Sequence, residues 1–203
     1  MAKHGPTWGV SPSIRGAVPQ YTAGGRPRPR PDSSSISSGF APLDLFTLRV
    51  LPYARQGTIL NATLVSADGR VLFFVTTDAT SGSERTVVLD GNRARVAIIT
   101  WDAHPTVYID DLGWSLHTAQ WLCLSSTRTC RTMIASGKQF SWLPNGECIE
   151  LFPLDSLHTQ ALASISHGSD GTVLQLTSTA LRLNLLNMTA ISTVLLMSGR
   201  SID

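Results

Sequence analysis

The fold is decided by one stretch in the last quarter of the chain, Leu183-Asn-Leu-Leu-Asn-Met-Thr-Ala-Ile-Ser-Thr-Val-Leu-Leu-Met197. It is the longest strongly apolar run that contains no charged residue, glycine or proline, and Arg182 and Arg200 stand on either side of it. A helix that is apolar on all sides has to be buried, either in protein or in a membrane. The stretch therefore predicts a core helix or a membrane anchor.

Helical spacing favours a helix over residues 181–198. Ser178 or Thr179 can cap its N-terminus, and Gly199 can end it. The β-branched residues within the stretch would also suit a strand, but burial can override local propensity. The residues expected to face the core are Leu186, Ala190, Ile191 and Val194.

A membrane span is the rival interpretation of the same stretch. The apolar run has about sixteen residues, whereas a spanning helix needs about 20. Asn184 and Asn187 lie within it, and amide side chains are unfavourable in hydrocarbon. We therefore expect no transmembrane span and a helix that is enclosed by the rest of the domain.

The chain before this helix has the pattern of short strands joined by tight turns. Residues 58–65 and 71–77 are rich in β-forming residues and flank Asp68-Gly69, and Asn145-Gly146 marks a second turn of this kind. Runs of about five residues recur at spacings of roughly 8–12, which is typical of a β sandwich or barrel. No helical period is interleaved between the strands, which argues against βαβ units.

Composition agrees with a single β-rich domain and excludes some partners. The chain has 203 residues, 15% of them charged, and a net charge of +2, which is too small to indicate a nucleic-acid partner. Cys123, Cys130 and Cys148 are odd in number and have no CxxC spacing. The first residues lack the apolar segment of a signal peptide, so we expect a reducing, cytoplasmic location.

Residues 1–39 differ from the rest and are expected to form a disordered basic tail, with the folded domain at 40–203. They are rich in proline, glycine and serine, and they carry five basic side chains against one acidic. The run Arg26-Pro-Arg-Pro-Arg-Pro31 favours a polyproline II conformation. It could bind an anionic phospholipid surface or a protein partner, or it could be a solvated linker.

No pattern in the sequence predicts catalysis, a cofactor or a metal. The nucleophile motif G-x-S-x-G, the phosphate loop and the dinucleotide fingerprint are all absent. His104, His117, His158 and His167 have no standard ligand spacing. Asp102 with His104 could act in acid–base chemistry, but this segment also has the composition of a turn.

Three basic residues form the candidate anion or lipid contact: Arg128, Arg131 and Lys138. If they share one face of the sheet, their side chains could bind a phosphate or an anionic headgroup. An ordinary solvated surface is the alternative. Trp101 and Trp142 are expected to anchor the core.

Several short motifs resemble a known family. Gly137-Lys-Gln-Phe-Ser-Trp142 is followed by Asn145-Gly-Glu-Cys-Ile-Glu-Leu151, then by Thr172-Val-Leu-Gln-Leu176 and the apolar terminal helix. This order, over residues 43–198, is similar to domains of unknown function common in basidiomycete fungi that are assigned a tubby-like fold. The resemblance implies a closed antiparallel β-barrel of about twelve strands around a central hydrophobic C-terminal helix.

Relatives of the tubby-like fold include tubby proteins, phospholipid scramblases and plant LURP-one-related proteins. Tubby-like domains bind phosphoinositide headgroups through basic residues on the barrel surface, although no such cluster matches here residue by residue. The resemblance thus implies a non-enzymatic binding or scaffold domain with anionic phospholipid as its candidate ligand. A protein-interaction module and an enzyme with a site at the barrel rim are the alternatives.

Overall fold

The computed structural model describes residues 45–54, 57–79, 82–154, 160–169 and 171–203. The tail predicted over residues 1–39 lies outside the described residues, as does the predicted start of the domain at residue 40. Within the described ranges the chain is mainly β, with a few short helices and one longer helix near its end.

Thirteen strands form one antiparallel sheet in the order β7-β6-β5-β4-β3-β2-β1-β13-β12-β11-β10-β9-β8. Strands that follow one another in sequence pair with each other, except β7 and β8, which lie at the two ends of the order. The first strand, β1, also pairs with the last, β13. The strands are β1 (Leu45–Pro52), β2 (Ala62–Ser66), β3 (Val71–Asp78), β4 (Glu84–Asp90), β5 (Arg95–Trp101), β6 (Thr106–Ile109), β7 (Trp114–His117), β8 (Cys123–Leu124), β9 (Arg131–Ala135), β10 (Lys138–Asn145), β11 (Cys148–Pro153), β12 (Ala163–Gly168) and β13 (Gly171–Thr177).

The turns between strands lie where the sequence predicts them. Asp68-Gly69 joins β2 to β3, and Gly69 has a φ of 84°, in the left-handed region that glycine adopts at little cost. Asn145 ends β10, and Gly146 occupies the turn to β11 with a φ of 60°. Short turns of this kind explain why so many consecutive strands pair as antiparallel neighbours.

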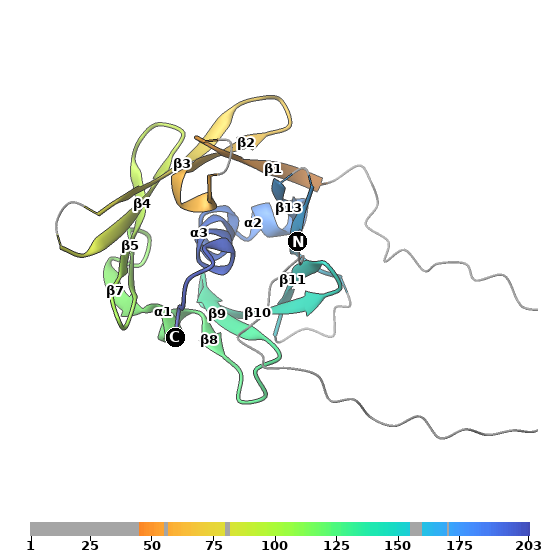
Figure 1. Cartoon of the computed structure of the whole chain (residues 1–203). Coiled ribbons are helices and arrows are strands. Elements are labelled where there is room, and N and C mark those ends of the chain that lie inside the picture. The colour runs from red at the N-terminus through yellow and green to blue at the C-terminus, as the bar shows by residue number, and fades with distance from the viewer. Residues whose placement is uncertain (1–44, 55–56, 80–81, 155–159, 170) are drawn as a thin grey trace, which may run out of the picture.

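The sheet curves around α3 (Leu186–Met197), which occupies its centre in Figure 1. Side chains alternate along each strand, so one set points toward α3 and the other points outward. The inward set is apolar and includes Leu48, Leu64, Ile99 and Trp142, which are all buried. Removing this apolar surface from water is the main force that holds the strands around the helix.

Helix α3 is buried on every side over residues 188–195, as expected for a helix surrounded by a sheet. Its polar residues are accommodated by bonds within the helix. The hydroxyl groups of Ser192 and Thr193 donate to the carbonyls of Met188 and Thr189 at 2.8 and 2.7 Å. These bonds satisfy the hydroxyl groups locally, so burial leaves no unpaired donor there.

The helical region begins differently from the prediction. A short helix, α2 (Ser178–Arg182), comes first and is capped by Thr177, whose hydroxyl accepts a bond from the Ala180 amide at 3.2 Å. Asn184 then adopts a φ of 55°, which interrupts the helix before α3 starts at Leu186. The single helix predicted over 181–198 is therefore two helices, because asparagine tolerates the left-handed conformation that ends the first.

The remaining short helices had no clear signal in the sequence. These are η1 (Ile59–Asn61), between β1 and β2, and α1 (Thr118–Trp121), between β7 and β8. The sheet has 13 strands rather than about twelve, and two of them, β7 and β8, fall in segments whose strand character the sequence leaves ambiguous.

Candidate anion-binding surface

The three basic residues predicted to form an anion contact do not share one surface. Arg131 is the first residue of β9 and points inward, so that only 3% of it is exposed. Its guanidinium donates to Asp203 through both terminal nitrogens, at 2.9 and 2.6 Å, and to the Leu122 carbonyl at 2.9 Å. Its charge is therefore directed at the protein's own groups and not at a ligand on the outer face.

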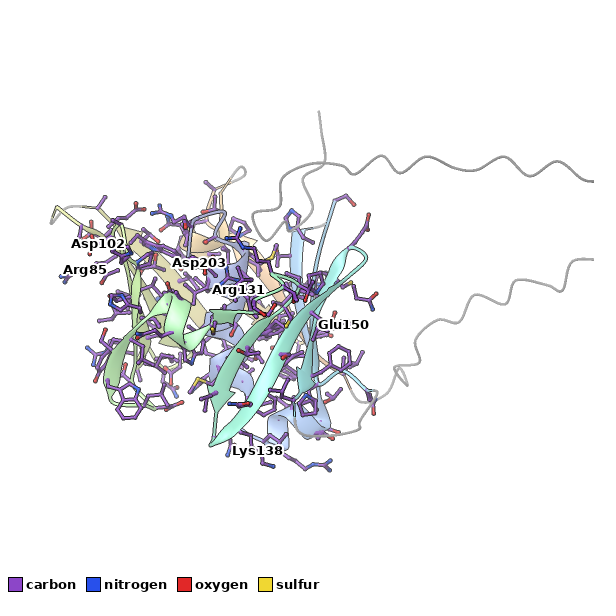
Figure 2. The ribbon with its side chains drawn as sticks, turned by 90° about the horizontal axis from the view of Figure 1, so that it is seen from below. Arg85, Asp102, Arg131, Lys138, Glu150 and Asp203 are labelled. Carbon is purple, nitrogen blue, oxygen red and sulfur yellow. The ribbon has the colours of Figure 1, made fainter. Side chains whose placement is uncertain are left out.

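Lys138 and Arg128 are exposed but lie at opposite ends of β9. Lys138 pairs with Ala135, the last residue of β9, whereas Arg128 lies in the turn that precedes the strand. Figure 2 shows Lys138 and Arg131 at opposite ends of the β9–β10 hairpin. The inward direction of Arg131 could have been inferred from the sequence, because side chains alternate along a strand. Arg131 lies two and four residues before Met133 and Ala135, which also point inward.

A different set of basic and apolar side chains comes together on the outer side of β1 to β4. We call it the arginine face. The strand register places Leu51 opposite Thr63, Thr63 opposite Phe74, and Phe74 opposite Leu89 in one row across four strands. The arginine face consists of Arg49, Leu51, Tyr53, Thr63, Val65, Phe74, Leu89 and Arg93.

Arg93 lies over this row at the turn between β4 and β5. Its guanidinium carbon is 3.9 Å from the centre of the Phe74 ring, within the range of a cation–π contact. Partial burial raises the pKa of the Tyr53 hydroxyl, and the positive charge of Arg93 opposes part of that rise. Arg93 thus lies close to two aromatic side chains, one of which is 54% exposed.

Arg49 adds a second cation to the arginine face. It projects from β1 between Val65 of β2 and Val173 of β13, which are its register partners. Among the described residues, neither Arg49 nor Arg93 forms an ion pair with a carboxylate. Leu51, 50% exposed, lies two residues further along β1 on the same side. The surface therefore combines two uncompensated cations with exposed apolar and aromatic groups.

The next arginine along the sheet is neutralised. Arg95 of β5 forms a bidentate pair with Asp110 at 2.9 and 2.8 Å, and its guanidinium lies 5.1 Å from the Tyr108 ring centre. The hydrogen bonds from Arg95 lower the pKa of the Asp110 carboxyl. The charge of Arg95 is therefore directed at Asp110 and not at a ligand on the outer face.

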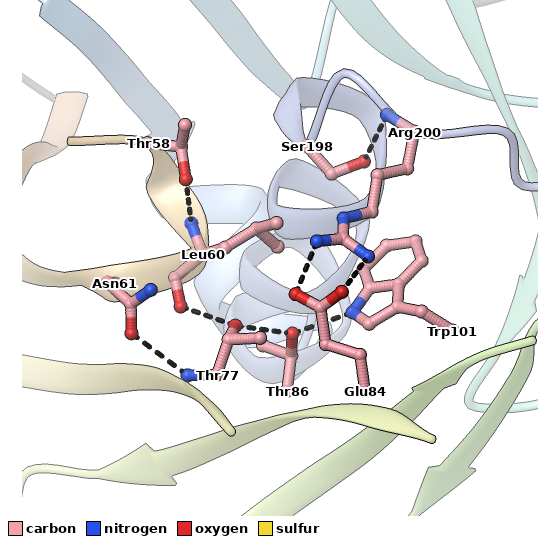
Figure 3. Close-up of polar contacts among 9 residues, drawn as sticks. All are labelled: Thr58, Leu60, Asn61, Thr77, Glu84, Thr86, Trp101, Ser198 and Arg200. Carbon is pink, nitrogen blue, oxygen red and sulfur yellow. Dashed lines mark hydrogen bonds and ion pairs between the residues drawn. The ribbon is translucent and has the colours of Figure 1, made fainter. Parts of the chain in front are cut away.

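Trp101 is the last residue of β5 and is only half-buried. Its indole N–H donates to the Thr86 hydroxyl at 2.7 Å, and that hydroxyl is 2.7 Å from the Thr77 hydroxyl, which bonds the Leu60 carbonyl (Figure 3). Trp142, in contrast, is fully buried. Of the predicted core residues on α3, Ala190, Ile191 and Val194 are buried and Leu186 is half-buried.

The histidines and cysteines do not form a site in the part of the chain that is described. His104 and His117 have ring centres 6.4 Å apart in an edge-to-face arrangement. His158 lies outside the described residues, and the ring of His167 contacts the Thr172 hydroxyl at 2.7 Å. No group of three or more His, Cys, Asp or Glu side chains that could hold a metal ion occurs within the described ranges.

Within the described ranges, no helix has both the length and the apolar character that crossing a bilayer requires. This includes α3, which has 12 residues.

Comparisons with known proteins give a family and one distant structural likeness. Residues 57–200 match a family described as a family of unknown function, DUF6593. The X-ray structure of a protein from Arabidopsis thaliana is similar with a TM-score of 0.42 at 12% identity, over 74% of this chain and 92% of that one. No curated protein matches the chain.

Proposed function

The chain belongs to the DUF6593 family of unknown function, and from its geometry we propose that it is a non-enzymatic domain that binds anionic phospholipid surfaces through the arginine face. We further propose that its sheet is a barrel of the tubby-like kind, closed around α3, as the motifs at residues 137–142 and 145–151 imply. In this proposal the outer face of the sheet, and not its interior, meets the ligand.

The observation that carries the proposal is the pairing of free cations with exposed apolar groups. An arginine near an anionic bilayer contributes about 1 kcal/mol of attraction, and Arg49 and Arg93 have no carboxylate to offset it among the described residues. Tyr53 and Leu51 project beside them, and tyrosine is favoured where a protein meets the headgroup region. The two kinds of group together suit a surface that is both charged and apolar.

A protein-interaction role is the second candidate, and it is favoured by a different surface. Ile134 of β9 pairs with Gln139 of β10, and the Leu154 amide donates to the Gln139 carbonyl at 2.9 Å. Ile134 and Leu154 are 56% and 53% exposed and lie on either side of Gln139, so two exposed apolar groups flank this position. Among the described residues, the positions next to Ile134 and Gln139 hold one cation, Lys138, and no arginine, which suits a protein partner better than an anionic bilayer.

Vesicle sedimentation of the full chain tests the proposal. Vesicles of phosphatidylcholine alone are compared with vesicles that also contain phosphatidylserine, at low salt. The double variant Arg49→Glu, Arg93→Glu is compared with Lys138→Glu, which reverses an exposed cation elsewhere on the sheet. We expect the double variant to bind the anionic vesicles at least tenfold more weakly and Lys138→Glu to bind almost normally.

Two results would contradict the proposal. One is equal binding to both vesicle types, and the other is an equal loss in the double variant and in Lys138→Glu. A chain that lacks residues 1–39 separates the face from the basic tail. If this truncated chain no longer binds anionic vesicles, the tail is the contact and the arginine face is not.

A further inference from the structure

After α3 the chain crosses one end of the sheet and contacts elements from distant parts of the sequence. This segment, residues 198–203, is called the strap. In Figure 1 it runs from the end of α3 toward α1 and β8. The two ends of the strand order are β7 and β8, and α1 connects them. Ser198 shapes its beginning, because its hydroxyl accepts a bond from the Arg200 amide at 3.1 Å.

The first anchor of the strap is Arg200. Its guanidinium forms a bidentate ion pair with Glu84, the first residue of β4, and one of these bonds is 2.7 Å. The same guanidinium lies 5.0 Å from the ring centre of Trp101, the last residue of β5 (Figure 3). The strap is therefore attached to the β4–β5 pair by charge and by an aromatic contact.

The second anchor is Ile202, which is 6% exposed and belongs to the core. Its carbonyl accepts a hydrogen bond of 2.6 Å from the hydroxyl of Thr118, a fully buried residue that begins α1. The Thr118 amide donates to the Pro105 carbonyl at 2.9 Å, which fixes α1 against the start of β6. This anchor joins the strap to the helix that connects β7 and β8.

The third anchor is Asp203, whose carboxylate accepts hydrogen bonds from both terminal nitrogens of the Arg131 guanidinium. Figure 2 labels the two residues. The two side chains differ in environment, because the Arg131 side chain is 4% exposed and the Asp203 side chain 50%. Asp203 can therefore move into water, whereas Arg131 would remain buried without this counter-charge. Arg131 begins β9, next to the edge strand β8.

We infer that the strap is a reversible closure that holds the two ends of the strand order together and opens as one unit. Its anchors lie on β4 and β5, on α1, and on β9, so the strap connects elements on both sides of the gap between β7 and β8 in the strand order. Opening separates Arg131 from Asp203 and withdraws Ile202 from the core. This device is separate from the arginine face and does not depend on the proposed lipid binding.

Native-state hydrogen exchange of the full chain tests this inference. Asp203→Asn removes the counter-charge of Arg131, and Arg200→Gln removes the pair with Glu84. Arg95→Gln is the matched control, because it removes a bidentate pair that lies away from the strap. We expect both strap variants to accelerate exchange at least tenfold in α1, β8, β9 and the end of α3, with β12 and β13 unchanged.

Three results would overturn the inference: acceleration no larger than in Arg95→Gln, uniform acceleration across the sheet, or different segments affected by the two strap variants. If either variant fails to fold, Thr118→Val serves in its place. It removes the hydroxyl bond to the Ile202 carbonyl at nearly constant volume, and the same segments should exchange faster.

Discussion

The outer side of the sheet differs between its two halves. On β1 to β4 it is the arginine face, with Arg49, Arg93 and Tyr53 among apolar neighbours. On β9 to β12 the outward positions are mostly small and polar, and we call them the serine face. Its residues are Thr132, Ser141, Glu150, Ser164 and Ser166; Ser141 and Ser164 are buried, and the apolar Phe152 lies opposite Ser141.

Apolar exposure alone does not distinguish these two faces. Leu51 of the arginine face is 50% exposed, and Ile134 beside the serine face is 56% exposed. The charge differs, since the serine face carries the carboxylate of Glu150, which accepts a hydrogen bond from the Asn145 amide at 2.9 Å. In the proposed function, free arginine, and not exposed hydrocarbon, therefore distinguishes the face that binds an anionic surface.

The largest effect is expected from the interior that both faces share. Ile191→Asp places a carboxylate where no solvent reaches, which should cost about 4 kcal/mol or more out of a total stability of roughly 5–15 kcal/mol. Thermal unfolding followed by circular dichroism should show no cooperative transition. As a control, Asn184→Asp changes an exposed position and should unfold like the natural chain. A cooperative unfolding transition in Ile191→Asp would show that α3 is not central to the fold.

A smaller effect is expected when the arginine face loses its apolar groups. The double variant Leu51→Ser, Tyr53→Ser removes side chains that would enter the headgroup region, each worth on the order of 1 kcal/mol. Binding to anionic vesicles should fall about tenfold with the fold intact. Ile134→Ser is the matched change beside the serine face, and an equal loss in that variant would remove the distinction between the faces.

The electrostatic effect of Arg93 on Tyr53 can be tested by titration. Burial raises the pKa of Tyr53, and Arg93 partly lowers it, so Arg93→Gln should raise this pKa further. Ultraviolet absorbance of the phenolate measures the change. Arg70→Gln serves as the control, and an unchanged Tyr53 pKa in Arg93→Gln would place the guanidinium away from this ring.

The smallest effect concerns the neutralised pair of Arg95 and Asp110. Arg95 lowers the pKa of Asp110 in the folded protein, so the pair stabilises the fold above the unfolded pKa of Asp110. That stabilisation is lost as pH falls through the lowered folded value. Carboxyl chemical shifts should show the Asp110 pKa rising in Arg95→Gln, and an unchanged value would mean that the two groups do not interact in solution.

Much of the fold was predictable because its signals are local. Gly69 and Gly146 have left-handed backbone, and each lies at the hairpin turn that Asp68-Gly69 and Asn145-Gly146 predict. The apolar stretch from Leu183 is helical from Leu186 and buried from Met188 to Leu195. The break at Asn184 was missed because a single left-handed residue leaves little trace in an apolar pattern.

The candidate site was harder to predict because it depends on register between strands. Arg93 meets Phe74 only because β3 and β4 pair with a particular offset, and no local pattern fixes that offset. Arg131 is a different case, since its inward parity could be inferred from its strand. Its partner, Asp203, could not, because 72 residues separate the two.

The central claim is that the arginine face, and not the serine face, contacts an anionic bilayer. Leu51→Cys and Ile134→Cys place a nitroxide label at positions of matched exposure, in a chain whose three natural cysteines are serine and which still folds. On vesicles that contain phosphatidylserine, we expect the label at position 51 to lose collisions with a water-soluble nickel reagent while the label at position 134 keeps them. Protection at position 134 alone, or at neither position, would contradict the account.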